Sequence, residues 1–502
     1  MSGPPIDRGW AILVLVGFFI TSFIMVGTAK SYGILMGELM KHFKISAATG
    51  ALVMGVSGAV YTITAPICVA CGEVFSQRKV VIVGSLIGFV MVGLSSLLVS
   101  MEYFIFFYGV GTGLANACFF GNGLVMVGMY FKKWRSLATG LALSGASVGT
   151  FVIPILLEAL LETFSLYGAI LVISAFYFNG CVSAALYRPF SFYTKCAEKK
   201  NSPDSKNELL PQEEPTVKEP TEQSETEKIQ TESEKNTEYS HVESEEEVKK
   251  SLLELNQTED TTSKQPAPAP SGRPVWRFEL CGRTWSLPVI IQFNVLKMPV
   301  VLFFTVFSFF VFIGYFNFIL FLPVDALSRG ITRYEKAVLV SCTGVGDLVG
   351  RILVGFLGDL KLIQRYKILA ISCILCGANI IMFEIAGQVY WWMAIHATLY
   401  GFFGGCYVAI NSIVLIDMVG LKLMPKALGV VLLIQGLGAA IGQPLEGKIR
   451  DETRTYTSLN IINTVLMVSA GMFLFLYPLV KRFQDKPPRK EESMQVQVPE
   501  EA

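Results

Sequence analysis

The chain has 502 residues, of which 52% are hydrophobic and 16% are charged, and its formal net charge at pH 7 is +1. Soluble domains carry about 25% charged residues, so this composition indicates a membrane protein. The near-neutral balance also leaves no basic field for binding nucleic acid. The apolar runs are long, and a helix needs about 20 apolar residues to cross a membrane whereas a barrel strand needs about 10. The sequence therefore predicts membrane-spanning helices.

The first part of the chain, residues 1–189, holds six apolar runs that are each long enough to span a membrane. We expect an N-terminal six-helix bundle here. Its predicted spans are 11–35, 48–71, 79–99, 103–129, 137–160 and 166–187.

The composition changes abruptly in residues 190–298, where Glu, Lys, Ser, Thr, Gln and Pro dominate. Such a segment cannot bury enough apolar area to offset the entropy lost on ordering, so we expect a disordered linker. Apolar residues return over 274–297 with arginines among them. This pattern favours an interfacial helix near 274–297 that leads into the next span.

Six further apolar runs follow in residues 299–482, and they predict a C-terminal six-helix bundle. The polar residues 483–502 are expected to form a disordered tail. The predicted spans are 299–323, 336–357, 367–386, 391–416, 427–445 and 458–480. Two six-helix bundles joined by a long polar loop resemble the major facilitator arrangement. The fold class predicted is therefore an all-α membrane protein with twelve transmembrane helices.

Basic residues are distributed unevenly between the predicted spans. With an even number of spans both termini lie on one side, and the loops of that side carry basic groups at 78–79, 132–135 and 365–367. Three loops of the other side carry none. The positive-inside rule then predicts cytoplasmic termini and a cytoplasmic linker.

Three charged residues lie more than three positions from either end of a predicted span: Lys30 in the first, and Asp347 and Arg351 in the eighth. A charged side chain at the centre of a membrane helix costs roughly 2.5 to 3.5 kcal/mol on insertion scales. Asp347 and Arg351 are four residues apart, so they share one helix face and can pair. Arg can hold a carboxylate through two parallel hydrogen bonds, and buried Asp or Lys can exchange a proton. These residues are therefore candidates for binding an anionic substrate and a proton.

Two structural interpretations of the same residues remain open. Asp347 and Arg351 can form a fixed ion pair that only holds spans together. Lys30 lies about two-thirds of the way along its span, so its side chain can instead extend to the outer interface.

Other polar and aromatic residues within the spans are weaker candidates for lining a cavity. Ordinary helix packing explains most residues of this kind. The candidates are Asn116, Asn122, Phe402 and Phe403. The three histidines have no metal-binding companions, and the chain shows no nucleophile and base set and no phosphate-binding loop. We therefore expect no metal, no cofactor and no enzymatic activity.

Short motifs resemble those of the monocarboxylate transporters of the major facilitator superfamily. The entry to the first span is similar to the family's DGGW in Asp7, Gly9 and Trp10. The entry to the fifth span, YFKKWRSLATGLALSGASVG, is similar to the family's YFxKRRxLAxGxAxxGxxxG. The residues shared with that motif include Tyr130, Phe131, Arg135, Gly140, Gly145 and Gly149. Small residues at such spacings let helices approach closely.

The resemblance also covers the ionisable residues. In the proton-coupled lactate and pyruvate carriers of this family, a Lys before Ser in span one and an Asp-x-x-x-Arg in span eight are functional. Lys30 and the pair Asp347 and Arg351 stand at the matching positions. The resemblance implies proton-coupled symport of a small monocarboxylate, such as lactate, pyruvate or a ketone body, across the plasma membrane by alternating access. It also implies a single-span immunoglobulin-type accessory protein as a candidate partner.

Two alternatives to this function stay open. The first is a pH-independent or sodium-linked carrier of another organic solute, which uptake insensitive to pH and to a protonophore would indicate. The second is a non-transporting sensor or trafficking protein that uses the fold as a scaffold. A phenotype that survives Lys30→Ala and Arg351→Ala would favour that second alternative.

Overall fold

The structure is a computed structural model, and it describes residues 6–188, 275–280, 283–288 and 293–484, apart from positions 98, 360–362, 386 and 421–422. The chain divides into two units, one formed by Met1–Lys195 with Ile290–Ala502 and the other by Cys196–Val289. Most of the linker predicted to be disordered, and the predicted tail beyond 484, lie outside the described residues.

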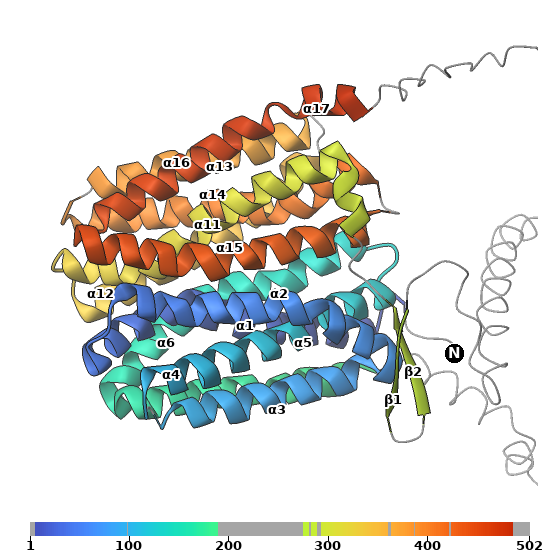
Figure 1. Cartoon of the computed structure of the whole chain (residues 1–502), viewed down its shortest axis with the longest axis horizontal. Coiled ribbons are helices and arrows are strands. Elements are labelled where there is room, and N and C mark those ends of the chain that lie inside the picture. The colour runs from blue at the N-terminus through green and yellow to red at the C-terminus, as the bar shows by residue number, and fades with distance from the viewer. Residues whose placement is uncertain are drawn as a thin grey trace, which may run out of the picture. The chain divides into compact units, whose positions relative to one another are not determined.

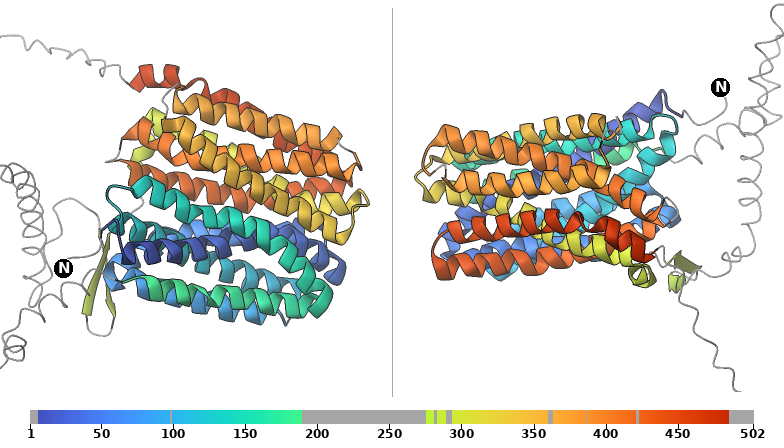
Figure 2. Two further views of the ribbon diagram at one scale, coloured as in Figure 1. Left: turned by 180° about the vertical axis from the view of Figure 1, so that it is seen from behind. Right: turned by 90° about the horizontal axis from the view of Figure 1, so that it is seen from above.

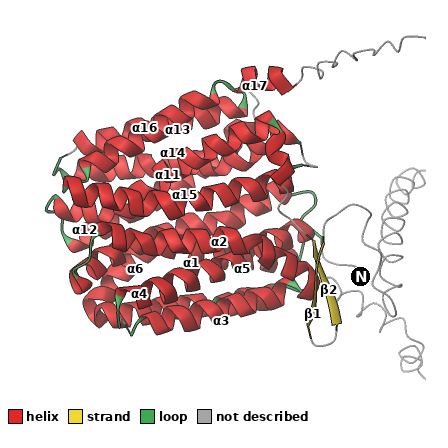
Figure 3. Ribbon diagram, in the orientation of Figure 1, coloured by secondary structure: helices red, strands yellow, loops and turns green. Residues whose placement is uncertain are grey.

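The elements described in the first half of the large unit are all helices, joined by short loops (Figure 3). Its elements are α1 (Trp10–Phe43), α2 (Ala47–Phe75), α3 (Gln77–Ser95), α4 (Met101–Phe104), the π-helical turn η1 (Ile105–Val110), α5 (Gly111–Tyr130), α6 (Arg135–Phe178) and α7 (Gly180–Leu186). Within α6 the backbone breaks at Ser165, whose φ is 59°. This break separates the expected fifth and sixth spans.

The second half begins with the 3-10 helix η2 (Phe293–Lys297), and Pro299 at the start of the next helix suits a first turn whose N–H groups have no partner. The helices are α11 (Pro299–Ser328), α12 (Arg333–Asp359), α13 (Arg365–Ile385), α14 (Tyr390–Val419), α15 (Met424–Thr453), α16 (Thr457–Leu474) and α17 (Tyr477–Gln484).

Eleven helices among the described residues are long and apolar enough to cross a membrane. One of them, Leu137–Leu186, contains both expected spans on either side of Ser165. The prediction of an all-α fold with twelve spans is therefore confirmed.

The buried apolar residues form two cores, one mainly from α1 to α7 with a few residues of α11, α12 and α16, and the other mainly from α11 to α17. The two sets of helices lie on opposite sides of the large unit in Figure 1 and in the left view of Figure 2. The halves meet where α2 packs against α15, α6 against α12, and α1 against α11. Large apolar side chains such as Ile63, Leu137 and Trp391 are exposed on the outer surface, as expected of helices whose solvent is lipid.

The small unit contains a β-hairpin instead of the interfacial helix expected near 274–297. Strands β1 (Val275–Leu280) and β2 (Arg283–Pro288) are antiparallel, with Phe278 opposite Trp285. The sequence alternates apolar and polar residues with a period of two in both strands, and this period places apolar residues on one face of a strand. Among the described residues of this segment, η2 at its end is the helical part.

Candidate functional site

Lys30 connects the two halves of the large unit. It lies in α1, and its side chain is only 4% exposed. Its Nζ donates a hydrogen bond of 3.1 Å to the hydroxyl of Tyr315 in α11, and it lies 4.0 Å from Oδ1 of Asp347 in α12. Lys30 therefore points to the second half of the fold, and not to an outer interface.

Asp347 is fully buried and lies at the centre of the cluster. The guanidinium of Arg351, one turn later in α12, approaches both carboxylate oxygens, with Nε 3.1 Å and Nη2 3.0 Å from Oδ2 and Nη2 3.3 Å from Oδ1. From the first half, the hydroxyl of Ser147 in α6 donates a hydrogen bond of 2.6 Å to Oδ2. Asp347 is thus bound by both halves, because Lys30 and Ser147 approach it from one and Arg351 from the other.

Glycines in α12 allow this close approach. A methyl group added at Gly344 would overlap the backbone of α6 near Ser147, and one at Gly346 or Gly350 would overlap the backbone of α14. These contacts hold α12 tightly between α6 and α14. Asp347 is consequently brought within hydrogen-bonding distance of Ser147.

Tyrosines form one wall of the cluster. The ring of Tyr315 stacks on that of Tyr400 with centroids 5.4 Å apart, and the Tyr400 hydroxyl donates a hydrogen bond to the Tyr315 carbonyl. The Lys30 ammonium lies 5.5 Å from the Tyr315 ring centroid. The contacts with Tyr400 therefore hold Tyr315 in the position where its hydroxyl accepts the hydrogen bond from Lys30.

Sequence reasoning missed Ser147 and Tyr315. Ser147 lies within the span-five motif, between Gly145 and Gly149. A polar residue on a glycine-rich helix face indicates a contact with a neighbouring helix, so the sequence did carry a signal for Ser147. Tyr315 gave no such signal, because the chain contains 18 tyrosines and nothing in their spacing separates this one from the rest.

The predicted cavity-lining residues lie in α5 and α14, and the backbone of Phe402 packs against Gly346 and Gly350 of α12. Asn122 donates hydrogen bonds to the carbonyls of Cys118 and Cys68, so it ties α5 to α2, and Asn116 is buried in α5. Phe402 and Phe403 form an edge-to-face pair within the core of the second half. In the described part of the chain, no side-chain hydrogen bond or ion pair joins these four residues to the Lys30 cluster.

Motif residues at the start of α1 form a separate set of structural hydrogen bonds. The Asp7 carboxylate accepts hydrogen bonds of 3.1 to 3.3 Å from three successive backbone N–H groups at 132–134, before α6. Gly9 has a φ of 58°, which favours glycine, and the Trp10 indole donates to the Leu186 carbonyl at 2.9 Å. The Tyr130 hydroxyl donates to the Arg188 carbonyl at 2.6 Å. These contacts join the start of α1 to the ends of α5 and α7.

The remaining motif residues serve mainly in packing. Phe131 is buried, and Gly145 and Gly149 face the backbone of α1 so closely that a side chain at either would overlap it. Gly140 has open space around it. The side chain of Arg135 lies outside the described residues.

An ion-pair network joins the halves at the end of the bundle where α1 ends and α12 begins. Arg333 approaches Glu38 of α1 at 2.9 Å and Glu158 of α6 at 3.0 Å. Lys336, whose side chain is 1% exposed, lies 3.3 Å from Glu158. This network closes that end of the interface between the halves.

Comparison with known proteins agrees with this architecture. The family model for the Major Facilitator Superfamily matches residues 18–312 and 302–500. Monocarboxylate transporter 12-B of Danio rerio is 26% identical over 489 residues, which cover 96% of this chain and 89% of that protein. Monocarboxylate transporter 12 of Homo sapiens is 25% identical over 96% of this chain and 83% of its own length.

Two further similarities extend the comparison. Monocarboxylate transporter 9 of Gallus gallus is 26% identical over 95% of this chain and 94% of its own. A crystal structure of a POT family transporter in complex with 5-aminolevulinic acid superimposes with a TM-score of 0.60 over 95% of this chain and 99% of that one, at 14% identity, and therefore supports the fold alone. The chain thus belongs to the Major Facilitator Superfamily and, within it, to the monocarboxylate transporter family, and it is a multi-pass membrane transporter and not an enzyme.

Proposed function

We propose that this chain is a proton-coupled symporter of small monocarboxylates of the lactate, pyruvate or ketone-body type, working by alternating access in the plasma membrane with cytoplasmic termini. The observation that supports this most strongly is that Lys30 of one half and Arg351 of the other converge on the buried carboxylate of Asp347. A substrate site shared between halves is what alternating access requires.

The charge balance of the cluster links an anion to a proton. With all three groups ionised, two cations and one anion leave a single positive charge, and the contacting groups of Ser147 and Tyr315 are neutral. A buried net charge is costly, so a bound monocarboxylate would stabilise the cluster in which Lys30 is protonated and Asp347 is ionised. Without the anion, loss of the Lys30 proton brings the cluster to zero charge. Anion and proton therefore favour each other's binding, and this effect is reciprocal.

Arg351 is the group best suited to hold the substrate carboxylate. Its guanidinium fork now engages both oxygens of Asp347, and a carboxylate is held by the same geometry. When the substrate carboxylate binds some of the guanidinium N–H groups of Arg351, Asp347 loses those hydrogen bonds. A proton on Asp347 or Lys30 would compensate for their loss. Anion and proton together move no net charge, so transport should be electroneutral.

We test this with uptake of a labelled monocarboxylate panel into expressing cells at two outside pH values. Uptake of lactate or a related acid should rise at the lower outside pH and acidify the cell. Arg351→Ala should reduce uptake by at least about 30-fold, because truncating one partner of a buried charge pair costs about 2 to 5 kcal/mol. The accessory immunoglobulin-type chain is co-expressed in a parallel arm, to separate failed surface delivery from failed transport.

The matched control is Arg351→Lys, which keeps the positive charge and removes the planar fork. It should retain pH-dependent uptake, with a raised KM for the monocarboxylate. Normal uptake by Arg351→Ala at equal surface expression would contradict the assignment, and uptake that ignores pH and a protonophore would favour a carrier of another coupling type.

A further inference from the structure

One buried carboxyl group in the second half has no basic partner. Among the described residues the buried carboxylic side chains are Glu158, Asp325, Asp347 and Glu446. The first three form ion pairs with Arg333 and Lys336, with Arg329, and with Arg351 and Lys30. Glu446, in α15, is 2% exposed and has no ion pair among the described contacts.

The neighbours of the Glu446 carboxyl are neutral amides. Asn463 of α16 donates a hydrogen bond of 3.1 Å to Oε2, and Asn317 of α11 lies beside the same carboxyl group. Both amides are 1% exposed. An ionised carboxylate held only by neutral dipoles keeps its charge in a low-dielectric environment, which is costly.

The hydrogen-bond inventory around Glu446 points to a missing proton. Oε1 of Glu446, Oδ1 of Asn463 and Oε1 of Gln443 are buried acceptors without a donor, whereas Nδ2 of Asn317 is the single buried donor among these four side chains without an acceptor, so acceptors outnumber donors. Gln443 lies three residues before Glu446, so both side chains share one face of α15. A protonated Glu446 would carry an O–H group that could donate a hydrogen bond to the side-chain oxygen of Asn463 or of Gln443. The same proton would remove the negative charge of the carboxylate. A buried water could supply the donor but not the neutralisation.

Among the described residues, no charged group on α15 or on the elements packed against it forms an ion pair with Glu446. Helix α15 packs against α2, α11, α14, α16 and η2, and α16 carries no ionisable acid or base. The charged and histidine side chains on the other elements have partners of their own or are exposed to solvent. Glu73 and Lys297 are exposed. Asp325 pairs with Arg329, Asp417 pairs with Arg365, and His396 forms a hydrogen bond with Asn379. On α15 itself, Lys426 lies at the opposite end of the helix and Lys448 lies near Glu452. Arg450, one turn after Glu446, pairs instead with Asp451.

We propose that Glu446, with Gln443, Asn317 and Asn463 around it, is a proton-binding site of the second half, separate from the Lys30, Asp347 and Arg351 cluster. The next residue, Gly447, packs against the backbone of Ala48 at the start of α2 in the other half. Loss of the proton would therefore place a charge in α15 beside the interface between the halves. The site thus makes the closed arrangement of α2 and α15 sensitive to proton binding.

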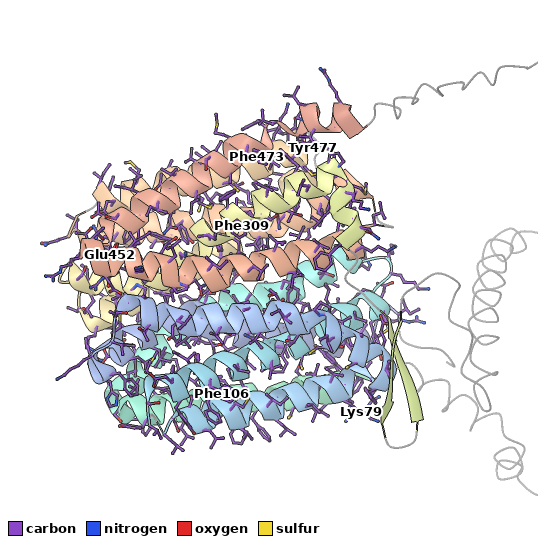
Figure 4. All side chains as sticks on the ribbon, viewed as in Figure 1. Lys79, Phe106, Phe309, Glu452, Phe473 and Tyr477 are labelled. Atoms are coloured by element: carbon purple, nitrogen blue, oxygen red, sulfur yellow. The ribbon has the colours of Figure 1, made fainter. Side chains whose placement is uncertain are left out.

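The proposal is tested by infrared spectroscopy on the purified full chain in lipid nanodiscs. The wild type should show the C=O stretching band of a protonated carboxylic acid that weakens as pH is raised, and Glu446→Gln should lose that band. The matched control is Glu452→Gln, which removes an exposed carboxylate from the end of the same helix (Figure 4) and should leave the band intact. Identical acid bands in the wild type and Glu446→Gln would overturn the proposal.

A second variant covers the case in which Glu446→Gln does not fold. Glu446→Asp keeps the acid and should show the band at a shifted frequency, so an unshifted band in a folded Glu446→Asp protein would also overturn the proposal. Stabilisation by added Na⁺ that depends on Glu446, with no acid band, would assign a metal cation to the site and reject the proton. The measurement needs no substrate, so its result is independent of whether the chain transports monocarboxylates.

Discussion

At the scale of single residues, the cluster around Asp347 combines a charged core with neutral positioning groups. Lys30 and Arg351 supply the positive charges, and Ser147 and Tyr315 fix the carboxylate and the ammonium. Hydrogen bonds to charged groups contribute about 1.5 to 3 kcal/mol each, so the hydroxyl of Ser147 can affect both the protonation of Asp347 and its contacts with Lys30 and Arg351.

Ser147→Ala should lower proton-driven uptake by about tenfold or more, because Asp347 loses its 2.6 Å hydrogen bond from the first half. The measurement is initial uptake across a range of outside pH, where the pH for half-maximal uptake should shift. Ser144→Ala is the control, since that exposed hydroxyl bonds only to the Leu141 carbonyl of its own helix. Equal pH profiles for both variants and the wild type would rule out a role for Ser147 in positioning Asp347.

At the scale of elements, close helix packing depends on particular glycines of the span-five motif. The backbone of α1 lies against Gly145 and Gly149 of α6, while Gly140 in the same motif meets open space. Within α6, the break at Ser165 separates two spans that the helix assignment joins. The same glycine type therefore has different structural importance at positions one or two turns apart.

Gly145→Ala should destabilise the protein, because its methyl group would overlap the Phe19 carbonyl and force α1 and α6 apart. Overpacking of this kind costs about 1 to 3 kcal/mol. Gly140→Ala should be neutral or stabilising, since Ala is favoured over Gly in a helix by about 1 kcal/mol. Thermal unfolding of both purified variants gives the comparison, and equal melting temperatures would show that the α1 and α6 contact tolerates a side chain.

At the scale of the whole molecule, the two halves are held together at one end by charge. Arg333 and Lys336 of α12 bind Glu38 and Glu158 of the first half. Of these residues, Lys336 and Glu158 are almost fully buried, so neither can replace its partner with water. A transporter that rocks one half against the other must break these contacts when that end opens.

Glu158→Gln should favour the conformation in which this end is open. The change leaves Lys336 with Glu38 alone, at 4.0 Å, and breaking a buried ion pair by removing one partner costs at most about 3 to 5 kcal/mol. Spin labels on the exposed residues Lys44 and Arg454, one from each half, should report a longer distance in the variant. Labels on Lys44 and Glu162, both exposed in the first half, serve as the control and should not change. An unaltered Lys44 to Arg454 distance would show that the network does not hold the halves closed.

Sequence alone determined the features that depend on local composition and spacing. Long apolar runs predicted twelve spans, because the bilayer sets the length of each helix, and the spacing of Asp347 and Arg351 predicted that they share a helix face. The sequence did not distinguish the β-hairpin at 275–288 from an interfacial helix, because the segment is apolar enough for such a helix and each strand carries only a short period of two.

Tertiary structure alone decided which distant residues meet. Lys30 and Asp347 are separated by more than three hundred positions, and Ser147, Tyr315 and the neutral surroundings of Glu446 come from different helices. Periodicity specifies which face of a helix is apolar, but not its rotation and depth against a helix of the other half. Those are set by packing between side chains and glycines that lie far apart in the chain, and this packing decides whether a buried charge finds a partner or is left to bind a proton.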